Sequence, residues 1–257
     1  MRPPPDAGER PQLSVVIPAF NEESVLPRTL ALLDEFLADS QPLRTEVLVV
    51  DDGSEDGTAA CAQGALGARG FVVRLPRNMG KGAAVREGVL RTRGDVVMIT
   101  DADGNYLHNR SGPYLAALSN ADIVLASRAH PASSWDVSPA ARRYMRRRRL
   151  MGRVFSRLVD LVAGVRLTDT QTGLKFLRGP QARQLFADMA TDGFAFDVEL
   201  LCRALRRGMR VAELPLVYTC ESCSTKVGRL DPLRMFVDLF RIRFLCRGER
   251  LRRGPAR

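Results

Sequence analysis

The sequence predicts an α/β fold built on a mostly parallel sheet with helices on both sides. Two observations predict it. Short apolar runs alternate with helix-periodic segments over the first 130 residues. These runs are β-branched and almost continuously apolar, which is typical of strands buried on both faces. With 257 residues, 45% of them hydrophobic, the chain can bury one sizeable core.

The first half of the chain supplies most of the predicted sheet. We expect strands at 13–17, 46–50, 71–75, 95–100 and 121–127, and helices at about 23–39, 57–66, 80–92 and 111–119. This alternation makes neighbouring strands parallel and the helices crossovers between them. Ligands of such sheets bind at the carboxyl ends of the strands.

The second half of the chain breaks the alternation. We expect a loop at 130–139, a long helix at 140–164, a turn-rich stretch at 165–179, helices at 180–189 and 196–207, a strand at 210–218, a loop at 219–230 and a helix at 231–247. Residues 1–12 are expected to be a disordered lead, 13–247 a single domain and 248–257 a basic tail. No stretch of 18 uncharged apolar residues occurs, so no transmembrane helix is expected.

The positive charge of the chain is concentrated in two segments. Residues 142–157 hold eight arginines and no acid, and residues 241–257 hold seven arginines and one acid. They carry +8 and +6 of a net charge of +10, which leaves −4 on the rest of the chain. Such segments bind polyanions, either anionic lipids or nucleic acid.

The five cysteines predict no zinc site. Cys220 and Cys223 form one C-x-x-C pair, without the second pair or histidines that a four-ligand site needs. We therefore expect reduced, unpaired cysteines.

Three polar clusters directly follow predicted strands. They are Pro18-Ala19-Phe20-Asn21-Glu22, Asp51-Asp52-Gly53-Ser54 and Asp101-Ala102-Asp103-Gly104. Each alone is compatible with an ordinary turn. Together they are expected to converge on one crevice, because the carboxyl ends of parallel strands lie at the same edge of a sheet.

The third cluster predicts a metal site. Residues i and i+2 of an extended chain face the same way, so Asp101 and Asp103 repel each other unless a cation neutralises them. Mg²⁺ or Mn²⁺ prefers oxygen ligands and bridges to phosphate oxygens. A glycosidase acid–base pair is the less favoured interpretation, because those carboxyl groups stand several ångströms apart to span a sugar.

The three lysines of the chain all lie in turns with glycine, serine or threonine. Lys81 follows a glycine-rich turn at a predicted helix start, which favours anion binding. Lys175 and Lys226 lie in TGLK and STK. A point charge on a flexible stem suits a phosphate, and ordinary surface lysines are the alternative.

Seven motifs in order resemble a known family. They are PAFNEE, VVDDGSEDGT, NMGKGAAV, DADG, ASRAH, DTQTGLKF and FAFDVELL. Together they resemble a family 2 glycosyltransferase with a GT-A fold, from about Leu13 to Phe244. Within that family they are most similar to the dolichyl-phosphate β-glucosyltransferases, with the dolichol-phosphate mannose synthases next.

The resemblance implies roles for individual residues. The nucleoside part of the donor would be held by Pro18, Ala19, Asn21, Glu22 and Asp52, and the metal by Asp101 and Asp103, with Asn105 as a third candidate. The acceptor phosphate would be bound by Arg128, Arg143 and Arg146, and the sugar and transfer site would be lined by Asp169, Gln171 and Lys175. Lys226 would lie on a loop that closes over the diphosphate. Lys81 and Asp101 would also contact the donor. The expected reaction is inverting transfer of a hexose from UDP-glucose to a polyprenyl or dolichyl phosphate.

The two basic helices predict a membrane-surface enzyme on the cytoplasmic face. Apolar residues recur every three or four positions in 140–164 and 231–247, with arginines between them, which is typical of interface helices. The alternative is that the apolar stripes belong to the core and the arginines form a solvated face. The eukaryotic family usually begins with a membrane anchor, and we expect none in this chain. A separate anchor protein or a homo-oligomer is therefore an expected partner.

Three other functions remain to be weighed. A donor such as GDP-mannose, or a glycan or small-molecule acceptor, keeps the fold and changes the substrate. A basic nucleic-acid-binding protein leaves the carboxylate clusters unexplained, so no nucleic-acid partner is expected. A nicotinamide-dependent enzyme is excluded, because Pro18-Ala19-Phe20 stands where a glycine-rich phosphate turn would follow the first strand.

Overall fold

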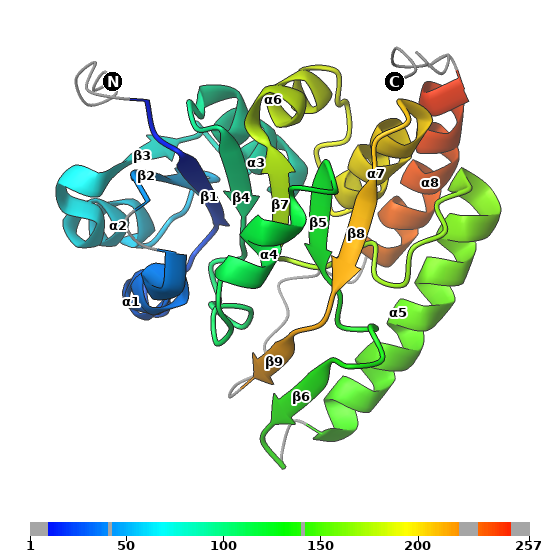
Figure 1. Ribbon diagram of the computed structural model, residues 1–257, viewed down its shortest axis with the longest axis horizontal. Coiled ribbons are helices and arrows are strands. Elements are labelled where there is room, and N and C mark those ends of the chain that lie inside the picture. The colour runs from blue at the N-terminus through cyan, green and yellow to red at the C-terminus, as the bar shows by residue number, and fades with distance from the viewer. Residues whose placement is uncertain (1–9, 41–42, 140–141, 221–230, 248–257) are drawn as a thin grey trace.

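A seven-stranded sheet with helices on both faces forms the centre of the molecule (Figure 1). The computed structural model describes residues 10–40, 43–139, 142–220 and 231–247. The strand order is β3-β2-β1-β4-β7-β5-β8. The predicted α/β fold is therefore confirmed.

The first four strands form the parallel part of the sheet. They are β1 (Leu13–Ala19), β2 (Thr45–Asp51), β3 (Gly70–Arg74) and β4 (Val96–Ile99). β1 pairs with β2 on one side and with β4 on the other, both in parallel. Their carboxyl ends therefore lie at one edge, as the alternating pattern predicts.

One central strand was missed by the sequence prediction. β7 (Lys175–Arg178) lies antiparallel between β4 and β5 (Ile123–Ala126), and β8 (Val211–Leu214) pairs parallel with β5. The expected turn-rich stretch 165–179 thus ends in a strand. The four residues of this strand carry too little local pattern to predict it, and pairing on both sides stabilises the strand instead.

A small second sheet corrects two further predictions. β6 (Ser134–Val137) lies in the expected loop 130–139 and pairs parallel with β9 (Val217–Cys220). The single strand expected at 210–218 is two strands in different sheets. Pro215 lies between β8 and β9 and has no N–H to donate to a ladder, so the chain leaves the main sheet there.

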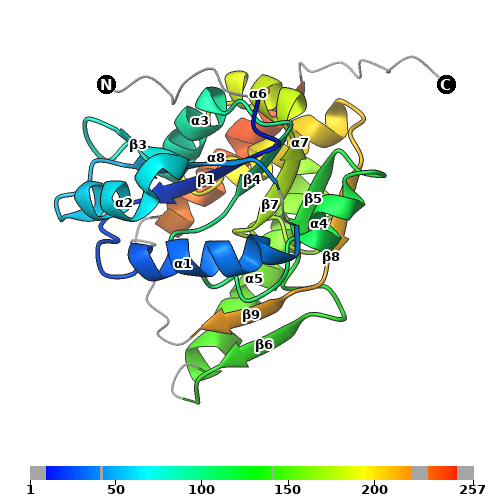
Figure 2. The ribbon, with the colours of Figure 1, turned by 60° about the vertical axis from the view of Figure 1, so that its left-hand side comes forward.

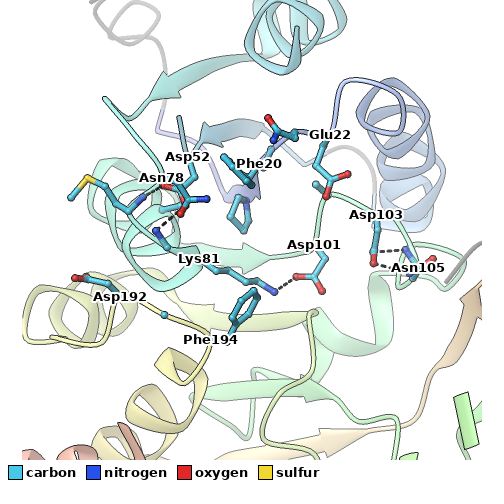
Figure 3. A pocket seen from close by; sticks show the side chains of 18 of the residues that line it. Phe20, Glu22, Asp52, Asn78, Lys81, Asp101, Asp103, Asn105, Asp192 and Phe194 are labelled. Atoms are coloured by element: carbon cyan, nitrogen blue, oxygen red, sulfur yellow. Dashed lines mark hydrogen bonds and ion pairs between the residues drawn. The ribbon is translucent and has the colours of Figure 1, made fainter. Parts of the chain in front are cut away.

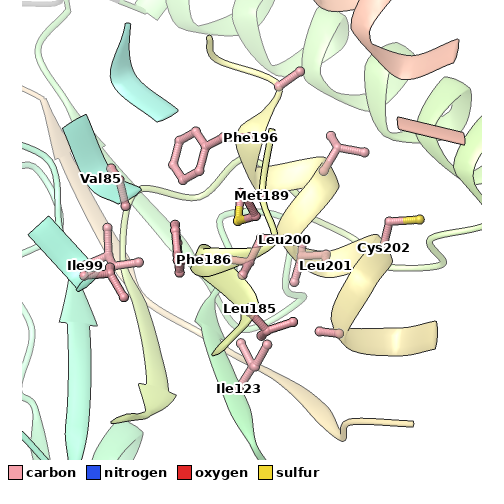
Figure 4. Packing of buried hydrophobic residues seen from close by; sticks show 14 of the residues in the cluster. Val85, Ile99, Ile123, Leu185, Phe186, Met189, Phe196, Leu200, Leu201 and Cys202 are labelled. Carbon is pink, nitrogen blue, oxygen red and sulfur yellow. The ribbon is translucent and has the colours of Figure 1, made fainter. Parts of the chain in front are cut away.

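Two apolar cores lie on opposite faces of the main sheet. In β1, Val15 and Ile17 belong to one core and Val16 to the other, because successive side chains alternate. The first core is covered by α1 (Leu26–Leu37), α2 (Thr58–Leu66) and α4 (Gly112–Ala117), and the second by α3 (Lys81–Arg91), α6 (Gly179–Ala187) and α7 (Phe196–Arg206). Figure 2 shows the layers from a second side, and Figure 4 shows the second core, where Phe186 packs among Ile99, Leu185 and Leu200.

The last helix packs beside the long basic helix at the β8 edge of the sheet (Figure 1). α5 (Arg142–Ala163) buries Val159 and Val162, whereas Leu150 and Met151 are exposed. α8 (Asp231–Arg247) is tied to α5 by Arg243, whose Nη1 donates to the Val162 carbonyl at 2.6 Å. Within the described ranges, no helix is both long and apolar enough to cross a membrane.

The cysteines correct one expectation. Cys220 is disulfide-bonded, so the cysteines are not all reduced. Cys61, Cys202 and Cys246 are free thiols, the last two of them buried.

Candidate active site

A pocket of about 1060 Å³ opens at the carboxyl ends of β1, β2 and β4 (Figure 3). The three polar clusters predicted to converge do meet there. The predicted residues that line it are Pro18, Ala19, Asn21, Glu22, Asp52, Lys81, Asp101, Asp103 and Asn105. The donor and metal residues expected from the sequence are therefore brought together, apart from Lys226, which lies outside the described residues.

The first two clusters are locked to each other by hydrogen bonds. The backbone N–H of Asn21 donates to Ser54 Oγ at 2.9 Å, and the backbone N–H of Glu55 donates to Asn21 Oδ1 at 2.9 Å. Asn21 has a φ of 52°, a left-handed conformation that asparagine tolerates better than most residues. The turn after β1 is thereby held against the turn after β2.

Asp52 fixes the turn that precedes α3. Its two carboxylate oxygens accept the backbone N–H groups of Met79 at 2.7 Å and Gly80 at 2.9 Å. Burial raises the pKa of Asp52, although these hydrogen bonds oppose the rise. Gly80 has a φ of 102°, and a Cβ there would lie 2.5 Å from the Asp192 carbonyl oxygen. This tight turn sets the start of α3 and with it Lys81.

Lys81 and Asp101 form an ion pair at the centre of the pocket. Lys81 Nζ lies 2.7 Å from Asp101 Oδ1. Burial has the largest effect and acts to raise the pKa of Asp101, but the charge and hydrogen bond of Lys81, with the charges of Lys175 and Arg128, together lower that pKa. Burial likewise acts to lower the pKa of Lys81, and the charges of Asp101 and Asp197 raise it. Both groups are therefore ionised at neutral pH.

Asp103 stands at the mouth of the pocket, and among the described residues no lysine or arginine pairs with it as Lys81 pairs with Asp101. It accepts hydrogen bonds from the Asn105 backbone N–H at 3.1 Å and from Asn105 Nδ2 at 2.7 Å. Although solvent reaches the side chain, the surrounding protein and the charge of Asp101 raise the pKa of Asp103 to about 6. An added positive charge would relieve this repulsion.

The carboxylate pair fits a divalent cation that shares its coordination with a ligand. The described residues contain no group of three or more Asp, Glu, His or Cys side chains that could hold a metal by themselves. Mg²⁺ is commonly bound by one or two carboxylates, with substrate phosphates and waters completing the shell. Asp101 and Asp103, beside an open pocket, match that donor set.

Gly173 makes room for the first of these carboxylates. A Cβ on Gly173 would lie 2.2 Å from Asp101 Oδ2 and 2.6 Å from Tyr106 Cε2. Any side chain there would push Asp101 or the Tyr106 ring away. The glycine of the DTQTGLKF motif therefore affects the position of Asp101, a residue of the predicted metal site.

Arg128 and Asp169 form an ion pair with each other and do not line the pocket. Arg128 Nε and Nη2 lie 2.7 and 2.8 Å from the two Asp169 oxygens, and Arg128 Nη2 also donates to the Gln171 carbonyl at 2.9 Å. Burial acts to raise the pKa of Asp169, and the bound Arg128 lowers it. None of these three residues lines the pocket. Their acceptor and transfer roles stay predictions.

Lys175 lies beneath the pocket instead of lining it. The side chain is 1% exposed and its Nζ lies 2.7 Å from Asp197 Oδ1. The ammonium also donates to the Thr172 carbonyl and lies 5.8 Å from the centre of the Phe196 ring. β7 is a central strand, and Lys175 faces Phe196 and Asp197 of α7, so its ammonium is buried and requires a buried acid. The FAFDVELL motif supplies that acid.

The remaining predicted acceptor residues lie on α5. Arg146 is exposed and does not line the pocket. Arg143 belongs to the same helix, and its side chain is outside what the structure describes.

The opposite wall of the pocket was not predicted. It is formed by the loop after α6 and by one face of α8, with Thr191, Asp192, Phe194, Arg234, Asp238 and Arg241 among its residues. The spacing of Arg234, Asp238 and Arg241 in steps of four and three was the available signal. We expected α8 to face lipid only, so this polar face was missed.

Comparison with known proteins agrees with this geometry. The family profile described as "Glycosyl transferase family 2" matches residues 14–178. A dolichyl-phosphate beta-glucosyltransferase of Drosophila melanogaster is 35% identical over 246 residues, 90% of this chain and 74% of that protein. The human protein of the same name is 33% identical over 257 residues, 93% of this chain and 78% of that protein.

Solved structures show the same fold at low sequence identity. Mannosyl-3-phosphoglycerate synthase from Rubrobacter xylanophilus superposes with a TM-score of 0.67 at 22% identity, covering 96% of this chain and 78% of that one. Glucosyl-3-phosphoglycerate synthase from Mycobacterium tuberculosis, in complex with Mn²⁺, UDP and glucosyl-3-phosphoglycerate, gives a TM-score of 0.61 at 20% identity, covering 95% and 82%. The fold is therefore GT-A. By its motifs, its fold and its relatives, the chain belongs to glycosyl transferase family 2, within the group of the dolichyl-phosphate beta-glucosyltransferases.

Proposed function

We propose that this glycosyltransferase transfers glucose from UDP-glucose to a polyprenyl or dolichyl phosphate, with Mg²⁺ or Mn²⁺, at the cytoplasmic surface of a membrane. The observation that carries the proposal is the pocket in which Asp52, Lys81, Asp101 and Asp103 meet. The relatives that share about a third of its sequence are named for glucose transfer to dolichyl phosphate. The glucosyl group and the dolichyl phosphate acceptor come to this chain from those names, and UDP-glucose as the donor is part of our proposal.

The pocket supplies two kinds of contact for the donor. At one end the Asp52 carboxylate and the turn after β1 offer hydrogen-bond acceptors suited to a nucleoside. At the centre Lys81 offers a cation for a diphosphate, beside the first turn of α3. A diphosphate that binds there would share the Lys81 ammonium with the Asp101 carboxylate.

Asp101 and Asp103 would hold the metal ion, whose positive charge supports departure of the nucleotide diphosphate when it is bound. Asn105 fixes the orientation of Asp103 through two hydrogen bonds. Gly173 leaves the space that the Asp101 carboxylate occupies. The protein thus holds both carboxylates in place before ligands arrive, which is the preorganisation that charge stabilisation requires.

The acceptor needs little activation by a general base. A phosphomonoester is largely dianionic at neutral pH, because its second pKa is near 6. Its phosphate oxygen can attack the anomeric carbon directly as the bond to the UDP oxygen breaks. A single in-line displacement inverts the anomeric carbon, so an α-linked donor gives a β-linked product. The protein contributes alignment and cationic contacts.

The membrane surface would be contacted by α5 and α8. Exposed apolar side chains on α5 include Leu150, Met151 and Val154, and Arg146, Arg149 and Arg153 are exposed beside them. Such a mixture suits anionic headgroups above an apolar layer. Attachment through a separate anchor protein or a homo-oligomer belongs to the same proposal.

The test is a product assay with competing substrates. The protein is incubated with UDP-glucose or GDP-mannose, with Mg²⁺ or Mn²⁺, and with polyprenyl phosphate, polyprenol or 3-phosphoglycerate. We expect one glucosylated lipid, formed from UDP-glucose and polyprenyl phosphate and lost with EDTA. A mannosylated product, or transfer to 3-phosphoglycerate alone, would overturn the proposal.

A further inference from the structure

Helix α8 presents three different faces. The proposed function uses only its exposed apolar face, as a contact with the membrane. Leu239, Ile242 and Cys246 are fully buried against the second core. A second face lines the pocket, and the third is exposed and apolar. The apolar stripe of α8, as we call it, consists of Leu233, Phe236, Val237, Phe240 and Phe244.

The face that lines the pocket carries two arginines and one acid. Arg234 and Arg241 are seven residues apart, which is about two helical turns or roughly 10 Å along the axis. Asp238 lies between them on the same face. Burial raises the pKa of Asp238, and the charge of Arg241 opposes this rise. With all three groups ionised, the face carries one net positive charge.

The face of α8 that lines the pocket adjoins the part of the pocket wall that contains Lys81. Asp238 Oδ2 lies 3.8 Å from the position a Cβ on Gly193 would take, so α8 packs close to the loop after α6. In the same loop the Asp192 carbonyl accepts the backbone N–H of Ala83 at 3.1 Å. The loop therefore connects the first turn of α3 with α8, and the arginines border the same cavity as the predicted diphosphate site.

The apolar stripe adjoins these arginines on the same helix. Phe244 is 77% exposed, and Phe236 and Phe240 stack edge to face with ring centres 5.2 Å apart. At about 100° per residue, Arg241 and Arg234 follow the stripe on the side that turns into the pocket. A molecule with a hydrocarbon chain and an anionic head could contact both faces at once.

The other two cations of the described pocket wall, Arg28 and Lys81, have surroundings that differ from those of the α8 arginines. In the described part of the chain that wall contains Arg28, Lys81, Arg234 and Arg241. Lys81 is paired with Asp101, and Arg28 lies on α1. Arg128, which the sequence resemblance favoured for an acceptor, is held by Asp169. The α8 pair borders the exposed apolar stripe of its own helix.

We infer that Arg234 and Arg241 bind the phosphate group of the lipid acceptor while the apolar stripe of α8 contacts its hydrocarbon chain. This inference rests on the proposed function only in taking a phosphorylated lipid as the acceptor. It makes the α8 side of the pocket the acceptor entrance and leaves the β1–β2 side to the nucleotide.

A binding experiment with a matched control tests the phosphate contact. Arg241→Gln is compared with Arg247→Gln, because Arg247 is exposed on the same helix and does not line the pocket. Phosphatidylcholine vesicles containing polyprenyl phosphate or neutral polyprenol are used in flotation assays. The wild type and Arg247→Gln should prefer the phosphate lipid at least tenfold, and Arg241→Gln should lose most of that preference. Equal preference in the two variants would overturn the inference.

A second variant should act in the opposite direction. Asp238→Asn removes the negative charge between the arginines, so affinity for polyprenyl phosphate vesicles should rise a few-fold, while thermal unfolding shows that the protein is folded. An unchanged or weaker affinity contradicts a phosphate at this position, because a merely structural role for α8 predicts no gain.

Kinetics separate the acceptor from the donor. Arg241→Gln should raise the KM for polyprenyl phosphate at least tenfold and leave the KM for UDP-glucose within twofold. A rise in the KM for UDP-glucose alone would assign Arg241 to the donor and overturn the inference. If the wild type transfers no glucose, the proposed function fails, and the flotation assay still decides the phosphate contact.

Discussion

Asp103 is the residue whose protonation controls the predicted metal site. Its pKa of about 6 in the folded protein lies above the ordinary value of 3.8, so folding favours the protonated acid. In metal-free buffer the resulting stabilisation is present below about pH 4 and is lost as the pH rises through 6. Bound Mg²⁺ or Mn²⁺ reverses this preference, because the metal requires the carboxylate.

We therefore predict that metal affinity depends on pH in a defined window. Mn²⁺ affinity should be nearly constant above pH 7 and fall about tenfold for each pH unit below 6, as protons compete for Asp103. Titration followed by electron paramagnetic resonance measures it. Asp103→Asn should abolish transfer and weaken Mn²⁺ binding, and its melting temperature without metal at pH 7 should not fall. Full activity of this variant in EDTA would remove Asp103 from the metal site.

Gly173 should affect metal binding through space alone. In Gly173→Ala the new Cβ meets Asp101 Oδ2 and the Tyr106 ring, so the carboxylate must move. We predict at least a tenfold loss of Mn²⁺ affinity and of kcat. Gly152→Ala is the control, since a Cβ there meets nothing within 4 Å. Wild-type metal affinity in Gly173→Ala would show that Asp101 can shift without effect.

The Lys175–Asp197 pair should contribute to stability rather than chemistry. Both side chains are almost completely buried, so Lys175→Met leaves the Asp197 carboxylate without its counter-charge. Removing one partner of a buried pair typically costs about 3–5 kcal/mol. Urea unfolding should show such a loss for Lys175→Met and recovery of much of it in Lys175→Met/Asp197→Leu. A folded Lys175→Met protein of normal stability that has lost kcat would instead support the predicted catalytic role.

At the scale of elements, α5 divides into a packed and an exposed part. Its last turns bury Val159 and Val162, while Leu150, Met151 and Val154 are open to solvent. The apolar stripe that the sequence predicts for this helix is therefore partly core. Arg149 also lies over the Trp135 ring, 4.6 Å from its centre, so one basic side chain is held against β6.

We predict that the four arginines at positions 146–149 bind anionic membranes through their charge. Each contributes on the order of 1 kcal/mol near an anionic surface, so a fourfold Arg→Gln variant should bind phosphatidylserine liposomes roughly a hundredfold or more weakly at low salt. A fourfold Arg→Lys variant keeps the charge and should retain most of the affinity. Unchanged partitioning of the Gln variant would identify these residues as a solvated face.

At the scale of the whole molecule, the pocket is assembled from distant parts of the chain. The turns after β1, β2 and β4 form one wall, which faces the loop after α6 (Figure 3). Helix α8 completes the second wall beside that loop. A ligand that contacts both walls should stabilise the entire fold, because binding to the native state alone shifts the unfolding equilibrium.

UDP with Mn²⁺ should therefore raise the melting temperature of the protein. At a hundred times the dissociation constant the stabilisation is about 2.7 kcal/mol, which corresponds to roughly 5–10 °C for a chain of this size. Differential scanning fluorimetry with UDP, Mn²⁺, both or neither measures it. ADP serves as the control nucleotide and should give a smaller shift. Identical shifts for UDP and ADP would argue against uridine selectivity.

The local sequence pattern was sufficient to predict the parallel half of the fold and one wall of the pocket. β1, β2 and β4 are continuous apolar runs, and their polar ends had to meet because parallel strands share an edge. β7 was missed because its four residues acquire strand character only between β4 and β5. Pro215 divides what is one apolar run in the sequence into strands of two sheets.

By itself the sequence determined the α/β class, the convergence of Asp52, Asp101 and Asp103, and the family. Each follows from residues close together in the chain or from ordered motifs. Only the tertiary structure decided that Arg128 is bound by Asp169, that Lys175 is buried with Asp197, and that α8 lines the pocket. These contacts join segments far apart in the sequence. Each charged residue has several possible partners, and the packing of the helices against the sheet decides which of them it meets.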